Sequence, residues 1–443
     1  MDKIRRVMVD MSATLIHHGH IKLIEQASQH GEVIIGLTSD EEILARKGYQ
    51  PELNFEQRQQ IMSALQHVKE VVKTPWLISE ELLDQHKIDL LVHGDDNSNS
   101  ISADRLLILP RTPGVSSTEL RQRALNSLVS ISNRKLMLTP GPAYLSSANV
   151  RGLRPVFGRG DDDYSEIESR VLDWIKTLSG QENVVRLQGS ATLALEVALK
   201  NFVAGKVLVV NTGYYSTRLC QLLDESCNIE QTTYESLPEH TGQYDWIVCC
   251  YVETSCGIKL DPNVLRQQTD RLGARLFMDA TASIGLEPEH HVADLMAFSS
   301  CKGLFGLTGA AFIAYRDGLE VASGRVWRDS SYYLNLDTHQ QLGVTGPYHA
   351  ICALDEIRGQ HPQMLERVVQ SKEKTLELWQ HCIDPAINQP LLCTYLRAKV
   401  EAVDDEVVLY SPRSPLPGSI ICHMGELDVD GVHFHERIKV TPL

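Results

Sequence analysis

The chain has 443 residues, of which 43% are hydrophobic and 22% charged, and its formal net charge is −15. Domains usually contain about 100–200 residues, so this length predicts roughly two to four folded units, and the composition excludes a wholly disordered or fibrous chain. The acidic balance argues against broad binding of nucleic acid, because neutralising phosphates requires a basic surface. A local basic pocket for a small phosphorylated ligand remains compatible with it.

No run of eighteen apolar residues is present, so we expect no membrane-spanning helix. The first residues lack the apolar core and cleavage site of a signal peptide, which favours a cytoplasmic protein. The ten cysteines form no C-x-x-C pair, so we expect free thiols and no metal site. His290 and His291 are adjacent in a loop, and we interpret them as solvated rather than as metal ligands.

Residues 1–120 alternate between predicted strands and predicted helices. The strands are expected at 5–11, 32–38, 88–94 and 106–110, and the helices at 20–30, 55–68 and 119–125. Strands that alternate with helices of about ten to fifteen residues predict an α/β fold with a parallel sheet. Ligands of such sheets bind beyond the carboxyl ends of the strands.

A second α/β unit is predicted after a connector. Its strands are expected at 206–213, 244–254, 274–281 and 310–316, and its helices at 166–178, 191–203, 263–273 and within about 340–382. Residues 390–443 mix strand-like runs with proline-rich loops. We therefore predict a first domain at 1–124, a connector at 125–134 and a second domain at 135–443.

The tetrapeptide His17-His18-Gly19-His20 follows the first predicted strand and opens a helix. Two imidazoles can face one pocket, the glycine lets phosphates approach the backbone, and the helix N-terminus adds positive charge. The pattern suits attack by a phosphate- or phosphonate-type oxygen on the α-phosphorus of a nucleoside triphosphate, where the protein positions groups and stabilises charge. Taken alone, the tetrapeptide fits a histidine-rich surface loop equally well.

A second pattern, Arg-Thr-Pro-Gly-Val-Ser-Ser-Thr at residues 111–118, lies between a predicted strand and a helix. Hydroxyl and amide groups at a helix start bind anions, and the Arg111 guanidinium can hold a phosphate through two hydrogen bonds. The two patterns together favour a nucleotide site over a surface loop.

These motifs resemble those of the H-x-G-H nucleotidyltransferases, specifically the cytidylyltransferases, and residues 4–124 are most similar to the domain fused to some phosphoenolpyruvate mutases. The resemblance implies a Rossmann-like domain that uses CTP with Mg²⁺. It implies that His17 and His20 stabilise the transition state, with Asp96 near the nucleotide. Asn97 stands where a tryptophan often follows in the family, a departure that bears on base recognition. The implied nucleotide-binding residues are Ser12, Thr14, Gly19, Lys47, Asp95, Arg111, Ser116, Ser117 and Thr118.

Three features of the second half suit pyridoxal phosphate. Asp279 ends a predicted strand, Lys302 lies in a glycine-rich turn, and residues 189–192, Gly-Ser-Ala-Thr, open a helix. The cofactor needs a lysine for its aldehyde, a carboxylate for its ring nitrogen and a helix start for its phosphate. Each feature alone has an ordinary structural interpretation, whereas their joint order and spacing favour the cofactor.

Residues 135–355 resemble class V, fold type I aminotransferases, most closely 2-aminoethylphosphonate–pyruvate transaminases. The likeness lies in the segments LTPGP, LQGSAT, NTGYYSTR, YVETSCG and TGPYH. It implies a homodimer in which Thr345 reaches the cofactor phosphate of the neighbouring subunit. The implied catalytic residue is Lys302, and the implied cofactor-binding residues are Ser190, Ala191, Thr192, Tyr215, Thr254, Asp279, Ser300, Lys302 and Thr345.

One departure concerns the substrate's acid group. The family binds this group with an arginine near the C-terminus, and Ile420 occupies that position here. A guanidinium from elsewhere is the chemically suitable replacement as a phosphonate anchor. The candidates are Arg154, Arg159, Arg328 and Arg413.

The two resemblances imply one metabolite. We expect the second half to convert phosphonoacetaldehyde to 2-aminoethylphosphonate, with an amino acid such as alanine as the donor, and the first half to join this product to CMP with release of pyrophosphate. Two alternatives stay open. The cofactor-binding half could be a lyase, a decarboxylase or a transaminase for a different substrate, or one half could be a non-catalytic sensor or dimerisation module.

Overall fold

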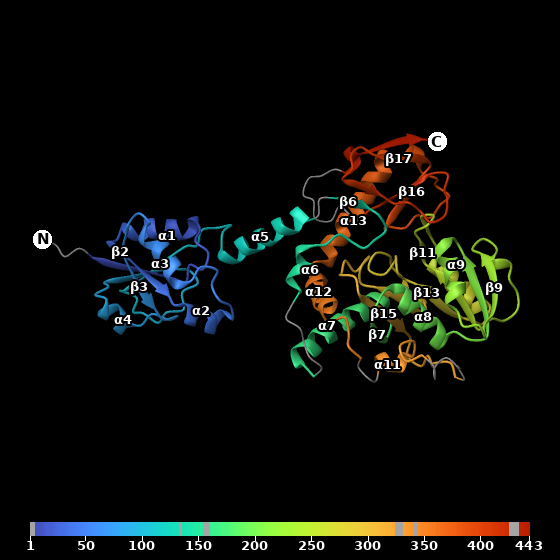
Figure 1. Ribbon diagram of the computed structural model, residues 1–443, viewed down its shortest axis with the longest axis horizontal. Coiled ribbons are helices and arrows are strands. Elements are labelled where there is room, and N and C mark those ends of the chain that lie inside the picture. Colours follow the sequence, from blue (N-terminus) through green and yellow to red (C-terminus); the bar gives the residue numbers. More distant parts are fainter. Residues whose placement is uncertain (1–4, 133–134, 154–159, 324–330, 341–343, 425–433) are drawn as a thin grey trace. The chain divides into compact units, whose positions relative to one another are not determined.

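The computed structural model describes residues 5–132, 135–153, 160–323, 331–340, 344–424 and 434–443, except for the side chains of 129–132. The chain divides into two compact units, Met1–Leu128 and Val129–Leu443. Helix α5 (Ser117–Ser132) crosses this division (Figure 1). Within the described ranges, no helix is long and apolar enough to cross a lipid bilayer.

The first unit contains a five-stranded parallel sheet in the order β3-β2-β1-β4-β5. The strand order reverses between β1 and β4, which is where open α/β sheets bind ligands. The strands are β1 (Arg6–Met11), β2 (Glu32–Thr38), β3 (Val68–Thr74), β4 (Leu90–Gly94) and β5 (Leu106–Leu109). The other helices are α1 (His18–Ser28), α2 (Asp40–Lys47), α3 (Phe55–Ser63) and α4 (Glu80–Gln85).

Both faces of this sheet are buried. Val7 and Val9 of β1 pack on one face in a cluster that includes Ile24 of α1, whereas Met8 packs on the other face with Leu83 of α4. Burial on both faces explains why β1 and β2 are almost continuously apolar rather than alternating.

The sequence located four of the strands of this unit and helices α1, α3 and α5, but it did not predict α2, α4 or the edge strand β3, and it made one helix too long. The helix predicted at 55–68 ends at Ser63, and Val68 already begins the edge strand β3. Two charged residues of β3, Lys69 and Glu70, are exposed. An edge strand of this kind lacks the apolar run that marks a central strand, and it resembles the end of an amphipathic helix.

The second unit is built on a seven-stranded sheet in the order β7-β15-β14-β13-β10-β8-β9. Strand β15 is antiparallel to both neighbours, and the other pairs are parallel. The strands are β7 (Asn183–Gln188), β8 (Lys206–Asn211), β9 (Asn228–Thr233), β10 (Trp246–Cys250), β13 (Arg275–Asp279), β14 (Leu295–Ser299) and β15 (Ala310–Tyr315). The α-helices besides α5 are α6 (Ser147–Arg151), α7 (Asp162–Ser179), α8 (Ala191–Phe202), α9 (Tyr214–Leu222), α10 (Pro262–Arg271), α11 (Leu336–Gln340), α12 (Tyr348–Arg358) and α13 (His361–Leu378).

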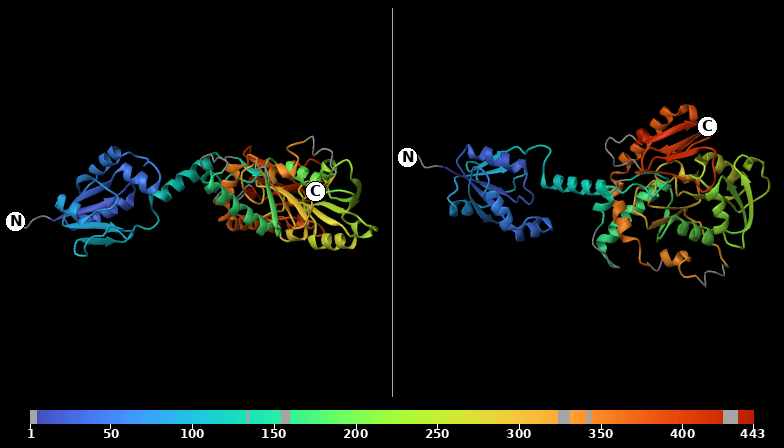
Figure 2. Two further views of the ribbon diagram at one scale, coloured as in Figure 1. Left: turned by 90° about the horizontal axis from the view of Figure 1, so that it is seen from below. Right: turned by 45° about the horizontal axis from the view of Figure 1, so that its top comes forward.

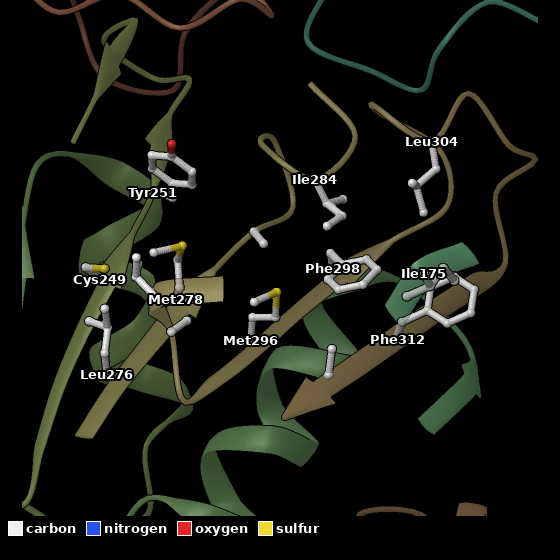
Figure 3. Close-up of a cluster of buried hydrophobic side chains, with 14 of the residues drawn as sticks. Ile175, Cys249, Tyr251, Leu276, Met278, Ile284, Met296, Phe298, Leu304 and Phe312 are labelled. Carbon is white, nitrogen blue, oxygen red and sulfur yellow. The ribbon is translucent and has the colours of Figure 1, made fainter. Parts of the chain in front are cut away.

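Two apolar clusters cover the two faces of this sheet. Leu276 and Met278 of β13 join one cluster with Ile175 of α7 (Figure 3). Phe277 between them joins the other cluster with Leu195 of α8. The alternation along β13 places successive side chains on opposite faces, as a strand requires. Helices therefore cover both sides of the sheet and leave its strand ends available.

The C-terminal residues form a small separate layer, drawn in red in Figure 2. It contains the pairs β16 (Cys393–Leu396) with β19 (Ser419–Cys422) and β17 (Ala398–Ala402) with β20 (Ile438–Pro442). Strand β18 (Val407–Leu409) pairs with β6 (Leu136–Leu138), and β11 (Val252–Glu253) with β12 (Ile258–Lys259). The short 3-10 helices are η1 (Leu237–Glu239), η2 (His290–Val292), η4 (Gln380–Cys382) and η5 (Phe434–Arg437).

One interpretation from the sequence was wrong. His290 is buried rather than solvated, and its Nε2 lies 2.9 Å from the Ser283 hydroxyl. The tertiary fold brings Ser283 to it from seven residues earlier, which its proline-containing loop gave no reason to expect.

Candidate active sites

The first site is a cavity of about 360 Å³ at the carboxyl ends of β1 and β4. It lies at the reversal of strand order, the position expected for a ligand in this kind of sheet. Most residues implied by the resemblance line it together, although they come from four separate segments of the chain. They are Ser12, His17, Gly19, His20, Lys47, Arg111, Ser116, Ser117 and Thr118.

His17 and His20 stack at the start of α1, with ring centroids 3.9 Å apart. The backbone N–H of His17 donates to Nδ1 of His20 over 3.2 Å, which leaves the proton of neutral His20 on Nε2. Burial lowers the pKa of His20 to about 4, with a further contribution from His17. Burial and the neighbouring His18 also lower the pKa of His17. Both rings therefore favour the neutral form near pH 7, and His20 can donate one hydrogen bond from Nε2.

Gly19 supports the His17 ring. A methyl group at this position would lie 3.0 Å from Nδ1 of His17 and 3.3 Å from Cγ1 of Val115. These approaches are tighter than ordinary carbon contacts, so a side chain would push the imidazole out of its place.

Gly19→Ala is therefore expected to lower nucleotidyl transfer by roughly tenfold, because the His17 ring has to yield by only a few tenths of an ångström, whereas a misplacement of about 1 Å at a reacting centre costs roughly 100-fold. Pyrophosphate release from CTP is the measurement. Gly359→Ala serves as the matched control, since a methyl group there meets nothing within 4 Å. Equal activity of the Gly19 variant and wild type would contradict the assigned role of this glycine.

The positive groups of the cavity are fixed by few contacts. Lys47 donates to the Ser12 hydroxyl over 3.0 Å and forms no ion pair with a described residue. Arg111 pairs with Asp96 at 2.7 Å, and a ligand anion would compete with that exposed carboxylate. The Ser116 hydroxyl accepts from the N–H of Glu119 and caps α5. The first residues of this helix line the cavity, where their N–H groups can bind an anion.

Two implied residues do not line this cavity. Thr14 is buried, and its hydroxyl accepts a hydrogen bond from Arg121 over 3.0 Å. Asp95 is exposed, and the next residue, Asp96, lines the cavity instead. The sequence analysis did not select Asp10 or His93, which lie on adjacent strands at the cavity and within 3.7 Å of each other. The available signal was a carboxylate near the end of an otherwise apolar strand.

The second site lies at the edge of the larger sheet where its parallel strands end. Ser190 follows β7, Asp279 ends β13, and Lys302 follows β14 by three positions. Strands β7, β13 and β14 run in the same direction, so their carboxyl ends meet at one edge. The sheet thereby brings together residues that are more than one hundred positions apart.

The turn that carries Lys302 is held by backbone contacts. The N–H of Phe305 donates to the Lys302 carbonyl over 2.8 Å, and the N–H of Gly306 donates to Ser300 over the same distance. Gly141 lies against the lysine, because a methyl group there would be 2.9 Å from Cγ of Lys302. Gly141 also has a φ of +136°, which favours glycine. The LTPGP segment therefore packs against the Lys302 side chain.

Tyr215 presents its ring to the same place, with the Lys302 Nζ 5.9 Å from the ring centroid. The start of α9 that carries Tyr215 is fixed by buried Glu253, which accepts from the N–H groups of Tyr215 and Ser216. Gly213 permits this contact, since a methyl group there would lie 2.7 Å from the Ser255 hydroxyl. Glu253 therefore positions the aromatic ring rather than facing a ligand.

Several buried polar atoms at this edge have spare hydrogen-bonding capacity among the described residues. Asp279 is 2% exposed, and its nearest cation is Arg218, 3.8 Å from Oδ2. The Arg218 Nε and Thr281 Oγ1 are buried without a hydrogen bond. A buried carboxylate with spare acceptor capacity suits a protonated ring nitrogen, and Lys302 suits an aldehyde. The residues present therefore fit pyridoxal phosphate.

The remaining implied cofactor residues fall into different environments. Ser190 caps α8 without using its hydroxyl, and Thr192 accepts from Arg218 over 3.3 Å. Together with Ala191 they form a helix start that can bind phosphate. By contrast, Ser300 is buried and donates to the Ala310 carbonyl over 3.1 Å.

Thr254 and Thr345 differ in exposure. Thr254 is buried beside the Glu253 contacts, and Thr345 is exposed. The loop of Thr345 is held by Arg186, which donates to the Val344 carbonyl over 3.2 Å. An exposed threonine on a fixed loop is free to contact a second subunit.

The arginine candidates are only partly described. Arg154, Arg159 and Arg328 lie outside the described residues. Arg413 donates to the Tyr214 hydroxyl over 3.2 Å and lies over its ring, and it forms no ion pair with a described residue. Ile420 is 2% exposed and packs in an apolar cluster, so its position holds no polar group.

Comparison with known proteins separates the two halves. The family described as Cytidylyltransferase-like matches residues 13–123. The 2-aminoethylphosphonate–pyruvate transaminase of Pseudomonas aeruginosa (strain UCBPP-PA14) is 29% identical over 257 residues, which cover 52% of this chain and 68% of that protein. A transaminase of the same name from Burkholderia lata, numbered 2, is 26% identical and covers 53% of this chain and 69% of its own.

Solved structures agree in fold. An aspartate aminotransferase of subgroup IV from Thermus thermophilus aligns with a TM-score of 0.56 and 19% identity over 65% of this chain and 93% of its own. Pyridoxamine-pyruvate aminotransferase from Mesorhizobium loti aligns with a TM-score of 0.52 and 20% identity over 66% and 87%. The matches to the cytidylyltransferase-like family and to the transaminases support nucleotidyltransferase and aminotransferase activity in one chain. The chain thus joins an N-terminal cytidylyltransferase-like domain to a C-terminal domain that is homologous to 2-aminoethylphosphonate–pyruvate transaminase and has the fold of pyridoxal phosphate-dependent aminotransferases.

Proposed function

We propose that this chain is a bifunctional enzyme of phosphonate metabolism. Its C-terminal domain converts phosphonoacetaldehyde to 2-aminoethylphosphonate, with an amino acid such as alanine as the donor. Its N-terminal domain then joins this product to CMP from CTP and releases pyrophosphate. The proposal rests on one observation: a domain similar to transaminases named for an aminophosphonate is fused to one that matches cytidylyltransferases.

The reaction of the N-terminal domain forms a bond between a phosphonate oxygen and the α-phosphorus of CTP and breaks the bond between that phosphorus and the pyrophosphate oxygen. Lys47, Arg111 and the start of α5 would bind the phosphates, together with Mg²⁺ that enters with CTP. His20 would donate from Nε2 to an α-phosphate oxygen as negative charge develops on it. No proton has to be removed from the acceptor, because a phosphonate is already ionised near pH 7.

In the second domain, bound pyridoxal phosphate would supply the aldehyde and the electron-withdrawing ring that amino transfer needs. Lys302 would hold the cofactor, and its Nζ would take the proton from the amino-bearing carbon of the donor and, in the second half-reaction, deliver a proton to the corresponding carbon of the acceptor. Asp279 would keep the ring nitrogen protonated, Tyr215 would cover one ring face, and Ser190 with Thr192 would bind the phosphate. Thr345 would complete the site of a second subunit in a homodimer.

Arg413 is the described candidate for the phosphonate anchor of this domain. Arg413→Ala is expected to raise KM for phosphonoacetaldehyde by roughly 10–100-fold, the scale of one lost charge-assisted hydrogen-bond pair, and Arg413→Lys to restore part of the loss. The KM for alanine should change little. Steady-state amino transfer measures both constants, and an unchanged KM for the phosphonate substrate would show that another residue binds it.

Phosphorus NMR of the purified protein with CTP, Mg²⁺ and 2-aminoethylphosphonate tests the proposal directly. A new pair of coupled phosphorus signals together with pyrophosphate is the expected result. Absence of a CMP conjugate with any aminophosphonate would overturn the proposed function of the first domain. Amino transfer from alanine to phosphonoacetaldehyde tests the second domain separately, and pyruvate formation is the quantity measured.

A further inference from the structure

A buried carboxylate on the floor of the first cavity has no role in the chemistry described above. Asp10, near the end of β1, is 6% exposed and lines the cavity. Its Oδ2 accepts from Nδ2 of Asn99 over 3.1 Å and lies 3.7 Å from Nε2 of His93. Its Oδ1 is buried and has no hydrogen-bond partner.

The surroundings of Asp10 leave its negative charge poorly compensated. Among the described residues, no lysine or arginine forms an ion pair with it, and His93 is the one ionisable nitrogen close to it. Burial raises the pKa of Asp10 to about 6, against the lowering effect of His93. An unpaired buried carboxylate is costly unless a cation or a donor reaches it. No described residue therefore offers a positive partner to Oδ1, and a cationic ligand group could supply one.

The chemistry of the site favours an organic ammonium group over a metal ion. Asn99 presents its NH₂ group to Asp10, and an N–H donor does not coordinate a cation. Within the described ranges, no group of three or more His, Cys, Asp or Glu side chains is arranged to hold a metal. A single ammonium needs only one or two oxygen acceptors, which Asp10 provides.

The other charged groups of the cavity also fit an aminophosphonate. Lys47 and Arg111 line it as cationic groups, and Asp96 pairs with Arg111, whereas Asp10 lines it from β1. A ligand with a phosphonate at one end and an ammonium at the other has the complementary charges. A neutral or purely anionic acceptor would leave Asp10 unpaired.

We propose that Asp10, oriented by Asn99, binds the protonated amino group of the acceptor and thereby selects aminoalkylphosphonates for transfer to CMP. This inference rests on the proposed function of the first domain and adds the subsite that gives it specificity. His93 lies beside the same carboxylate, with its Nε2 3.7 Å from Oδ2 of Asp10.

The test compares acceptors within one enzyme, so that the ratio of rates is independent of the active fraction. Full-length wild type and Asp10→Asn receive Mg²⁺ and CTP with 2-aminoethylphosphonate or 2-hydroxyethylphosphonate, and pyrophosphate release is measured. Wild type is expected to favour the amine at least about tenfold in kcat/KM, as expected for a buried charged group left unpaired. Asp10→Asn should lower kcat/KM for the amine by roughly 10–100-fold and change that for the alcohol by less than about threefold. Asp104→Asn, an exposed carboxylate outside this cavity, is the matched control.

Several outcomes would overturn the inference. Equal use of both acceptors by wild type would do so without any variant. A uniform loss with both acceptors, together with weaker binding of CTP in equilibrium dialysis, would assign Asp10 to the nucleotide. If Asp10→Asn is inactive, Asn99→Ala provides the second measurement, and an unchanged acceptor ratio there contradicts the orienting role.

Phosphoethanolamine separates this inference from the proposed function. It carries the same ammonium on a phosphate rather than a phosphonate. If wild type uses phosphoethanolamine alone and Asp10→Asn loses that activity, the ammonium subsite stands and the phosphonate function fails. If wild type uses neither amine, both fail.

Discussion

Lys302→Ala is expected to lower amino transfer to phosphonoacetaldehyde by about 10³-fold or more, the scale seen when a catalytic nucleophile is removed. The lysine would provide both the attachment of the cofactor and the proton transfer. Pyruvate formation from alanine is the measurement. Visible absorbance of the purified protein gives a second readout, because the variant can no longer attach the cofactor covalently.

The same variant should retain nucleotidyl transfer, because that site lies in the separate unit Met1–Leu128. Lys374→Ala is the matched control, since this exposed lysine pairs with Glu377 on the same helix, α13. Residual amino transfer close to the wild-type rate would show that Lys302 is not the reacting lysine. Loss of both activities would instead indicate a folding defect in the variant.

His20→Ala is expected to lower transfer of CMP by roughly 10²–10³-fold, the cost of losing one donor to developing charge. His18→Ala should have little effect, because His18 is exposed and does not line the cavity. The comparison is sharp, since the two histidines are only two positions apart in the motif. Pyrophosphate release from CTP measures both variants, and equal losses would contradict the assignment of His20.

The lowered pKa of His20 also predicts how the stability of the first domain depends on pH. Burial holds the imidazole neutral until about pH 4, whereas the unfolded chain would protonate it near pH 6.5. Protonation of the unfolded chain therefore removes stability as pH falls from about 6.5 toward 4, and the first domain should unfold more readily in that window. Thermal unfolding of wild type and His20→Ala between pH 7 and 5 measures the difference, and parallel curves would contradict it.

The sequence determined the class of each half because chemistry-bearing residues are clustered locally. His17, Gly19 and His20 are adjacent, and so are Ser190 to Thr192, so each motif carries its own helix start and its own reactive groups. Runs such as 246–250 are apolar throughout, which marks a strand buried on both faces. Local patterns of this kind can be recognised without knowing which other segments the residues contact in the fold.

The tertiary structure decided which of these residues work together. Asp10 lies on β1, whereas His93 lies on β4 and Asn99 in the loop that follows it, and the parallel pairing of β1 with β4 brings the two segments together at the cavity. The same applies to Glu253, whose contacts with the start of α9 identify it as a positioning residue. Side-chain contacts across a sheet depend on strand register and burial, and these cannot be read from the residue at a single position.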